Sequence, residues 1–274
     1  MKTVSELLTE CSFLKRRDAE DLVADFFGWS RLELYLHFDQ PITQNEWQEC
    51  LERARRFEEG EPLAYISGMV EFYGCRVHTT PAALIPRPET EILVDKIASY
   101  LKGRELAGRV LWDLCCGTGC IGIALKKRFP LLKVVLADIS ESALELAREN
   151  CLMNQVEVVS VQGDLLQPLE GQRVDYCVCN PPYLSEQEYR VLGKEVKGYE
   201  PKLALLGGEQ GTEFYAALAG QLPAHLYSGG ALWLELGYTQ GDAVTTLFSG
   251  PPWKNQRLEK DWAGHHRFFF VEKE

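Results

Sequence analysis

One four-residue segment, Asn180-Pro181-Pro182-Tyr183, combines groups that could hold a flat polar substrate. The two prolines fix their own φ angles and carry no N–H, so the carbonyl groups here are rigid acceptors. Asn180 adds a side-chain carbonyl acceptor, and Tyr183 adds a ring that can lie over a planar group. This set suits an sp² nitrogen that bears two hydrogens, as in an amide or an aromatic amine. A plain turn between a strand and a loop is the simpler alternative.

A second candidate, Cys115-Cys116-Gly117-Thr118-Gly119, lies where an apolar stretch gives way to a helical pattern. Glycines at a strand-to-helix turn let a ligand approach the backbone, and the start of the helix offers free N–H groups. Such a turn alone is weak evidence, because short glycine loops also serve packing. Because Cys115 has a Cβ atom, we expect no strong requirement for positive φ at this first position.

Two acidic residues follow the next apolar stretches. Asp138 comes roughly twenty residues after the glycines, where a carboxylate can accept hydrogen bonds from both hydroxyls of a ribose. Asp164 and Leu165 follow the stretch after that, placed to bind an adenine amino group and to press an apolar side chain on the ring. Each aspartate alone could be a solvated residue or a helix cap. Together with the glycine turn, they predict a site for an adenosine-containing ligand.

The glycine turn favours S-adenosylmethionine over NAD as that ligand. A dinucleotide loop commonly reads Gly-x-Gly-x-x-Gly, and Ile121-Gly122 breaks this spacing. Asp113, just before the turn, is a poor neighbour for phosphates but a tolerable one for a sulfonium cation. With Asn180 beside this ligand, the sequence predicts in-line methyl transfer to nitrogen. Catalysis would come from positioning and electrostatics, without a covalent enzyme intermediate or a strong general base.

The elements that must position these residues are short apolar strands that alternate with helices. Buried parallel strands separated by helices predict a doubly wound α/β fold with a mostly parallel, Rossmann-like sheet. Ligands in such sheets bind at the carboxyl ends of the strands, where the candidate residues fall. The predicted strands are residues 110–114, 134–137, 156–161, 174–179, 231–236 and 268–271, and the helices between them include 121–129, 142–153 and 212–222.

The N-terminal residues have a different pattern, with apolar residues at helical spacing. Ser30 with Glu33, and Thr43 with Glu46, each match a capping box, so two helices should start there. No polar constellation lies within this part, which therefore looks like a recognition domain or a scaffold. The expected domains are a small helical substrate-recognition domain at 1–70, a β-hairpin linker at 71–88 and the α/β domain at 89–274.

Composition narrows the class of protein further. The chain has 274 residues and a formal net charge of -11, which disfavours generic binding to nucleic-acid phosphates and makes a basic protein surface a better partner. Neither a signal peptide nor a membrane span is recognisable, so we expect a cytoplasmic protein without membrane contact. The nine cysteines lack zinc-ligand spacing, so reduced, buried thiols and no metal are expected.

Several longer motifs carry a family resemblance over nearly the whole chain. The chain resembles the HemK-type methyltransferases, which modify peptide-chain release factors on the glutamine of a Gly-Gly-Gln motif. Asn-Pro-Pro-Tyr is shared with DNA adenine and RNA guanine methyltransferases, so it indicates the chemistry and not the substrate. The more specific motifs are Glu61-Pro62-Leu63-Ala64-Tyr65-Ile66-x-Gly68, Glu71-Phe72-Tyr73-Gly74, Leu84-Ile85-Pro86-Arg87-Pro88-Glu89-Thr90-Glu91 and Glu200-Pro201-x-x-Ala204-Leu205-x-Gly207-Gly208.

This resemblance implies a class I methyltransferase fold and methyl transfer from S-adenosylmethionine to the side-chain amide nitrogen (N5) of that glutamine. The implied partners are class I release factors. Residues 87–90 would help to close the site near the methionyl end of the cofactor. The implied substrate-binding residues are Asn180, Pro181, Pro182 and Tyr183, with catalytic roles for Asn180, Pro181 and Tyr183, and the implied cofactor-binding residues are Cys115, Cys116, Gly117, Thr118, Gly119, Asp138, Asp164, Leu165 and Asn180.

Two other functions remain open from the residues. The same chemistry could act on an adenine or guanine amino group of DNA or RNA, which would require a basic, aromatic-bearing surface. The chain could also be a non-enzymatic binding module with a vestigial methyltransferase fold. The joint presence of Asp138, Asp164 and Asn180 argues against such decay.

Overall fold

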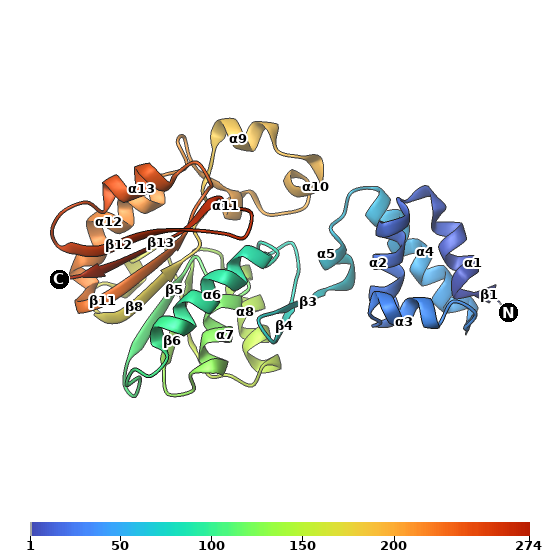
Figure 1. Cartoon of the computed structure of the whole chain (residues 1–274), viewed down its shortest axis with the longest axis horizontal. Coiled ribbons are helices and arrows are strands. Elements are labelled where there is room, and N and C mark those ends of the chain that lie inside the picture. Colours follow the sequence, from blue (N-terminus) through green and yellow to red (C-terminus); the bar gives the residue numbers. More distant parts are fainter. Residues whose placement is uncertain (1) are drawn as a thin grey trace. The chain divides into compact units, whose positions relative to one another are not determined.

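The computed structural model describes residues 2–274, which form two compact units. The first comprises residues 2–68 together with Lys194–Tyr199, and the second comprises Met69–Gly193 with Glu200–Glu274 (Figure 1). The β-hairpin expected as a linker belongs to the second unit. The domain boundaries and the recognition role assigned above stay predictions.

The first unit is helical around its own apolar core. Both predicted capping boxes are confirmed, because Ser30 and Thr43 each accept a backbone N–H while Glu33 and Glu46 return the bond. The core includes Leu7, Leu22, Leu34 and Trp47. The elements are β1 (Lys2–Thr3), α1 (Val4–Glu10), η1 (Cys11–Phe13), α2 (Arg16–Phe27), α3 (Arg31–Leu36), β2 (Pro41–Ile42), α4 (Gln44–Glu58), α5 (Leu63–Ser67) and α10 (Lys194–Lys197).

A seven-stranded sheet forms the centre of the second unit, in the order β12-β13-β11-β8-β5-β6-β7. The pairs from β11 through β8, β5 and β6 to β7 are parallel, whereas β13 runs antiparallel to both β11 and β12. The mostly parallel sheet is therefore confirmed. The strands are β5 (Val110–Leu114), β6 (Lys133–Asp138), β7 (Val159–Gln162), β8 (Val174–Cys179), β11 (Leu226–Glu235), β12 (Trp253–Lys260) and β13 (His266–Lys273).

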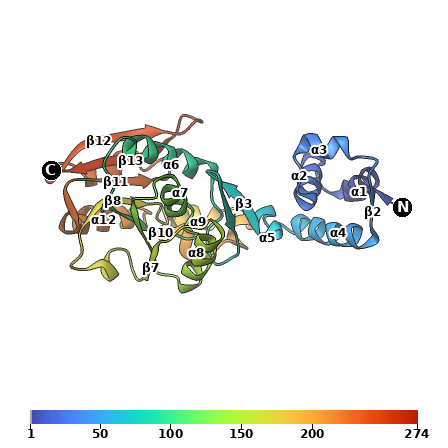
Figure 2. The ribbon, with the colours of Figure 1, turned by 90° about the horizontal axis from the view of Figure 1, so that it is seen from below.

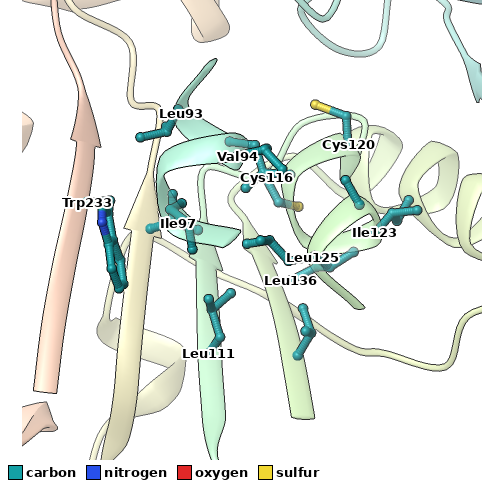
Figure 3. Close-up of a cluster of buried hydrophobic side chains, with 14 of the residues drawn as sticks. Leu93, Val94, Ile97, Leu111, Cys116, Cys120, Ile123, Leu125, Leu136 and Trp233 are labelled. Carbon is teal, nitrogen blue, oxygen red and sulfur yellow. The ribbon is translucent and has the colours of Figure 1, made fainter. Parts of the chain in front are cut away.

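Helices cover both faces of this sheet (Figure 1, Figure 2). Successive residues of β5 point to opposite faces, so Leu111 packs with α6 to α8, and Trp112 packs with α12 and α13. Figure 3 shows the first of these cores, where Ile97 of α6 and Ile123 of α7 lie over the strands. These helices are α6 (Pro88–Leu101), α7 (Cys120–Arg128), α8 (Glu141–Met153), α12 (Glu213–His225) and α13 (Gly241–Leu247).

Smaller elements complete the second unit. The hairpin of β3 and β4 is bound to α8, since the His78 N–H donates to Asn150 Oδ1 at 2.6 Å. After β8, the chain passes through short helices and one parallel pair of strands, β9 with β10, none of which was predicted. The elements are β3 (Met69–Phe72), β4 (Cys75–His78), η2 (Gln167–Leu169), β9 (Leu184–Ser185), α9 (Glu186–Val191), α11 (Lys202–Leu205) and β10 (Leu206–Gly208).

The edge strand β12 was also missed by the sequence prediction. Most of its residues are exposed or half-buried, so it has no continuous apolar run. Across residues 2–274, no helix combines the length and apolarity needed to cross a bilayer. The same residues contain no group of three or more His, Cys, Asp or Glu side chains arranged to hold a metal ion.

Candidate active site

A cavity of about 230 Å³ lies in the second unit, where β5, β6, β7 and β8 end. It brings together most of the residues predicted to bind the cofactor. Among the predicted residues, Gly119, Pro181 and Tyr183 do not line the cavity, whereas Pro182 does. The predicted cofactor residues that line it are Cys115, Cys116, Gly117, Thr118, Asp138, Asp164, Leu165 and Asn180.

The turn after β5 has a tighter backbone than the sequence suggested. Cys115 has a φ of 53°, so the expectation that this position does not need positive φ is wrong. Gly117 and Gly119 follow with φ values of 53° and 77°, and Gly119 caps the start of α7. A non-glycine residue at positive φ costs conformational energy and persists only where its surroundings fix it. The turn is thus held in one shape beside the cavity.

Asp138, the last residue of β6, contacts this turn directly beside the cavity. Its Oδ2 accepts the Gly117 N–H at 2.9 Å, and its Oδ1 accepts the Ser140 N–H at 3.0 Å. A carboxylate has about four lone-pair sites, so each oxygen keeps capacity for one more donor. Burial raises the pKa of Asp138, while the backbone N–H donors oppose that shift. The arrangement can accept two neighbouring hydroxyl groups, as the ribose prediction requires.

The next strand end supplies an acid and an apolar side chain. Asp164 is exposed at the cavity, and Leu165 is half-buried with a φ of 45°. Backbone hydrogen bonds hold this turn, because the Gly163 N–H donates to the Asp138 carbonyl at 3.0 Å and the Gln167 N–H donates to the Asp164 carbonyl at 2.9 Å. An acceptor beside an apolar surface can hold a flat ring that carries an amino group.

Asp113 does not line the cavity, contrary to the expectation that its charge would lie beside the ligand. It is fully buried under the turn, where its Oδ2 accepts the Gly122 N–H at 2.8 Å. Burial raises the pKa of Asp113 to about 8, so the side chain is mainly neutral at pH 7. Its Oδ1 is the one buried side-chain polar atom within residues 2–274 that lacks a hydrogen-bond partner. The preference for a cation over phosphates must therefore rest on Asp138 and Asp164.

Two segments remote in sequence form another wall of the cavity, residues 81–87 and the Pro201–Ala204 region. Glu200 joins them, since it is buried, pairs with Arg87 and accepts the Ile85 N–H at 3.3 Å. Apolar periodicity alone did not indicate this wall. The family motifs around Arg87 and Glu200 did include residues of this wall, and Arg87 and Thr90 both line the cavity.

The Asn180-to-Tyr183 segment leaves β8 at the edge of the same cavity. Cys179, immediately before it, is paired with Leu114 of β5 and Leu234 of β11, so the segment starts from the centre of the sheet. Asn180 is half-buried and lines the cavity together with Pro182. Burial and the nearby Glu235 raise the pKa of Tyr183 to about 12, so its hydroxyl stays neutral at pH 7. A planar amide could reach Asn180 from the cavity side.

The sheet order and the site at its carboxyl edge define a class I methyltransferase. Two solved structures share this fold. A methyltransferase from Pyrococcus furiosus has a TM-score of 0.54 at 19% identity, covering 81% of this chain and 98% of that one. The T. thermophilus 16S rRNA N2 G1207 methyltransferase, in complex with AdoMet and guanosine, has a TM-score of 0.51 at 18% identity, covering 75% of this chain and 50% of that one.

The sequence comparisons identify the family within this class. The family called methyltransferase small domain matches residues 88–197, and the PrmC N-terminal domain matches residues 1–68. The release factor glutamine methyltransferase of Chlamydia trachomatis serovar L2 is 40% identical over 94% of this chain and 88% of its own length. That of Geobacter sulfurreducens is 38% identical over 85% and 81%. The chain belongs to the family of release factor glutamine methyltransferases.

Proposed function

We propose that the protein transfers a methyl group from S-adenosylmethionine to the side-chain amide nitrogen, N5, of the Gly-Gly-Gln glutamine in class I release factors. The observation that carries this proposal is that Asn180 lines the same cavity as Asp138, Asp164 and Leu165. An amide held at Asn180 would therefore lie next to a nucleoside held by the other three residues. The names of the relatives support the choice of a release factor as substrate.

The residues of the cavity fit S-adenosylmethionine. Asp138 keeps lone pairs for the ribose hydroxyls, and Asp164 with Leu165 offers an acceptor and an apolar contact to the adenine. The two acids also favour a ligand with a positive charge, because Arg87, the cation in the lining, is already paired with Glu200. When bound, the cofactor supplies an electrophilic methyl group on a sulfonium.

The chain's own contribution is to orient the substrate amide. The side-chain carbonyl of Asn180 and a backbone carbonyl of the proline pair can each accept one N–H of the glutamine NH2. This holds the nitrogen in one orientation and pushes electron density onto it, which favours attack on the methyl carbon. Transfer to this nitrogen would form the new N–C bond as the S–C bond of the cofactor breaks, and the nitrogen would then release one proton to solvent. No side chain has to act as a strong base.

The substrate class separates this proposal from methylation of DNA or RNA amino groups. A net charge of -11 opposes a phosphate backbone, and the cavity lining adds the carboxylates of Asp138 and Asp164. A protein loop that carries an uncharged glutamine does not meet this repulsion. Because release factors act during translation, we place the reaction in the cytoplasm, without a direct nucleic-acid or membrane partner.

The test is incubation of the protein with S-adenosylmethionine that carries a labelled methyl group and with a purified release factor, in parallel with tRNA, rRNA and duplex DNA. Fragmentation mass spectrometry should locate the label on the Gly-Gly-Gln glutamine. A release factor with that glutamine changed to alanine is the matched control and should stay unlabelled. Label in nucleic acid alone, or in the control factor, would overturn the proposal.

A further inference from the structure

One buried side chain outside the cavity, Gln240, contacts the end of the Asn180-to-Tyr183 segment. Its Nε2 donates to the Tyr183 carbonyl at 2.7 Å and to the Gly211 carbonyl at 3.0 Å. Its Oε1 accepts the Gly237 N–H at 2.9 Å. Both amide hydrogens are used, and the residue is 7% exposed. A single side chain thus joins three loops that are remote in sequence.

Two glycines make this contact possible. A Cβ at Gly211, where φ is 79°, would overlap the Tyr183 carbonyl oxygen, and a Cβ at Gly207 would overlap the Pro182 carbonyl oxygen. Backbone therefore approaches the segment so closely that a side chain at either position would displace it. The position of the Tyr183 carbonyl is fixed by contacts on several sides.

The contact lies at the end of the segment that the sheet does not hold. At the other end, Cys179 is paired with strands on both sides. Pro181 and Pro182 stiffen the backbone between these two anchors. Asn180 is the first residue of this braced path, so a shift of the Tyr183 carbonyl would be transmitted to it through two rigid residues.

We propose that Gln240 is a positioning residue for methyl transfer: it fixes the Tyr183 carbonyl and so sets where Asn180 presents its acceptors. This inference rests on the proposed function. Gln240 does not line the cavity, so it acts through the segment and does not contact the cofactor or the substrate amide. Loss of its hydrogen bonds should therefore reduce the rate of transfer and leave cofactor binding intact.

The experiment replaces Gln240 by methionine, which keeps the length of the side chain and removes all three hydrogen bonds. Because small misplacement of reacting groups can cost a hundredfold in rate, we expect Gln240→Met to lower kcat for release-factor methylation by about tenfold or more. KM for S-adenosylmethionine, and the Kd for S-adenosylhomocysteine by calorimetry, should stay within about twofold. Gln240→Glu keeps the acceptor for the Gly237 N–H and loses both donors, so it should also lower kcat. This variant replaces Gln240→Met in the test if Gln240→Met does not fold.

Gln256→Met is the matched control. Gln256 also donates its side-chain amide to a backbone carbonyl, that of Phe248, but outside the segment. The substitution Gln256→Met should therefore leave kcat for release-factor methylation unchanged. Hydrogen exchange supplies a readout that needs no substrate: peptides covering residues 183–185 should exchange faster in Gln240→Met and not in Gln256→Met.

The outcomes separate this inference from the proposed function. If the unchanged protein fails to label the release factor, the function is wrong, and the exchange data alone judge whether Gln240 holds the segment. If it labels the factor but Gln240→Met keeps its kcat, the positioning role is wrong. The positioning role would also be wrong if Gln240→Met lowered kcat and weakened the binding of S-adenosylhomocysteine by the same factor, because that pattern indicates a general destabilisation of the protein.

Discussion

Asn180 and Asp138 border one cavity, but their free lone pairs would serve different molecules. Asn180→Ala removes an acceptor that is needed where the amide reacts, while the contacts of Asp138 with Gly117 and Ser140 stay in place. Removing one such electrostatic contact commonly costs about 10² to 10³ in rate. We therefore expect Asn180→Ala to lower kcat at least about a hundredfold, with the Kd for S-adenosylhomocysteine changed little. Single-turnover assays and calorimetry measure the two quantities.

Asp138→Ala should have the opposite profile. It removes both acceptors for the ribose hydroxyls and also releases the Gly117 and Ser140 N–H groups that shape the turn. Two lost hydrogen bonds to a charged acceptor, at about 1.5 kcal/mol or more each, correspond to a Kd for S-adenosylhomocysteine weaker by about a hundredfold or more. The rate at saturating cofactor should fall less than in Asn180→Ala. If the two variants show the same pattern, the division between substrate and cofactor residues is incorrect.

Residues at strand ends could be predicted from the sequence because local patterns mark them. A buried strand followed by Asp138, or by Asn180 and two prolines, can be recognised within a few residues. The role of Gln240 could not be predicted, because its partner Tyr183 is 57 residues away in the chain. The positive φ of Cys115 was also missed, since a cysteine gives no local sign that a packed environment holds it in that conformation.

At the scale of elements, β11 and α6 are joined by a buried carboxyl group. Thr90 of α6 donates its hydroxyl to Glu235 Oε2 at 2.8 Å, and Glu235 is the last residue of β11. Burial raises the pKa of Glu235 to about 7 from 4.5, while Thr90 and Arg267 oppose that shift. The folded protein therefore holds a proton that the unfolded chain releases between these two pH values. This group lowers stability as pH rises through that window.

Replacing the carboxyl by an amide removes this titration and keeps an acceptor for Thr90. The free energy of unfolding of Glu235→Gln, relative to the unchanged protein, should thus rise between pH 5 and pH 8, by about 2 to 3 kcal/mol for a shift of this size. Urea unfolding at both pH values measures it. Other buried acids such as Asp113 titrate in both proteins and cancel in the difference. A difference that does not change with pH would show that Glu235 titrates normally.

The prediction of secondary structure was most accurate for buried strands, because burial on both faces requires a continuous run of apolar residues. The five inner strands were found because each is buried on both faces of the sheet, and Figure 3 shows one of these faces for β5 and β6. The edge strand β12 and the short elements between β8 and α12 were not found, since they expose polar residues and owe their form to contacts elsewhere. Glu200, which holds the second wall of the cavity, comes from that unpredicted region.

At the scale of the whole chain, the stretch between Tyr183 and Pro201 is divided between the two units. Residues 194–199 are part of the first unit, although they lie in sequence between Tyr183 and the cavity wall at Pro201. Within the first unit, the Tyr199 hydroxyl donates to the Glu59 carbonyl at 3.3 Å. The chain therefore passes between the units at 68/69, 193/194 and 199/200. A sequence prediction that assigns domains one after another along the chain could not show that residues 194–199 belong to the first unit.

The nine cysteine thiols differ in burial, so the number that reacts in the native protein can be predicted. All are free, and every one except Cys115 is buried. Burial raises the pKa of Cys116, Cys177 and Cys179, so these thiols resist reaction both by access and by a low thiolate fraction. Cys115 is half-buried and lines the cavity. In the native protein, Ellman's reagent should react with one thiol in a fast phase, and with nine after unfolding in guanidinium.

S-adenosylhomocysteine should slow that fast phase, because Cys115 lines the cavity that the ligand would fill. With the ligand at about ten times its Kd, only about a tenth of the protein is free, so the rate should fall about tenfold. Cys115→Ala should abolish the fast phase and leave eight thiols after unfolding. A fast phase that persists in Cys115→Ala, or a rate that the ligand does not change, would place the reactive thiol, or the ligand, away from the turn after β5. Because the assay needs no release factor, it tests the cofactor half of the site independently of the substrate.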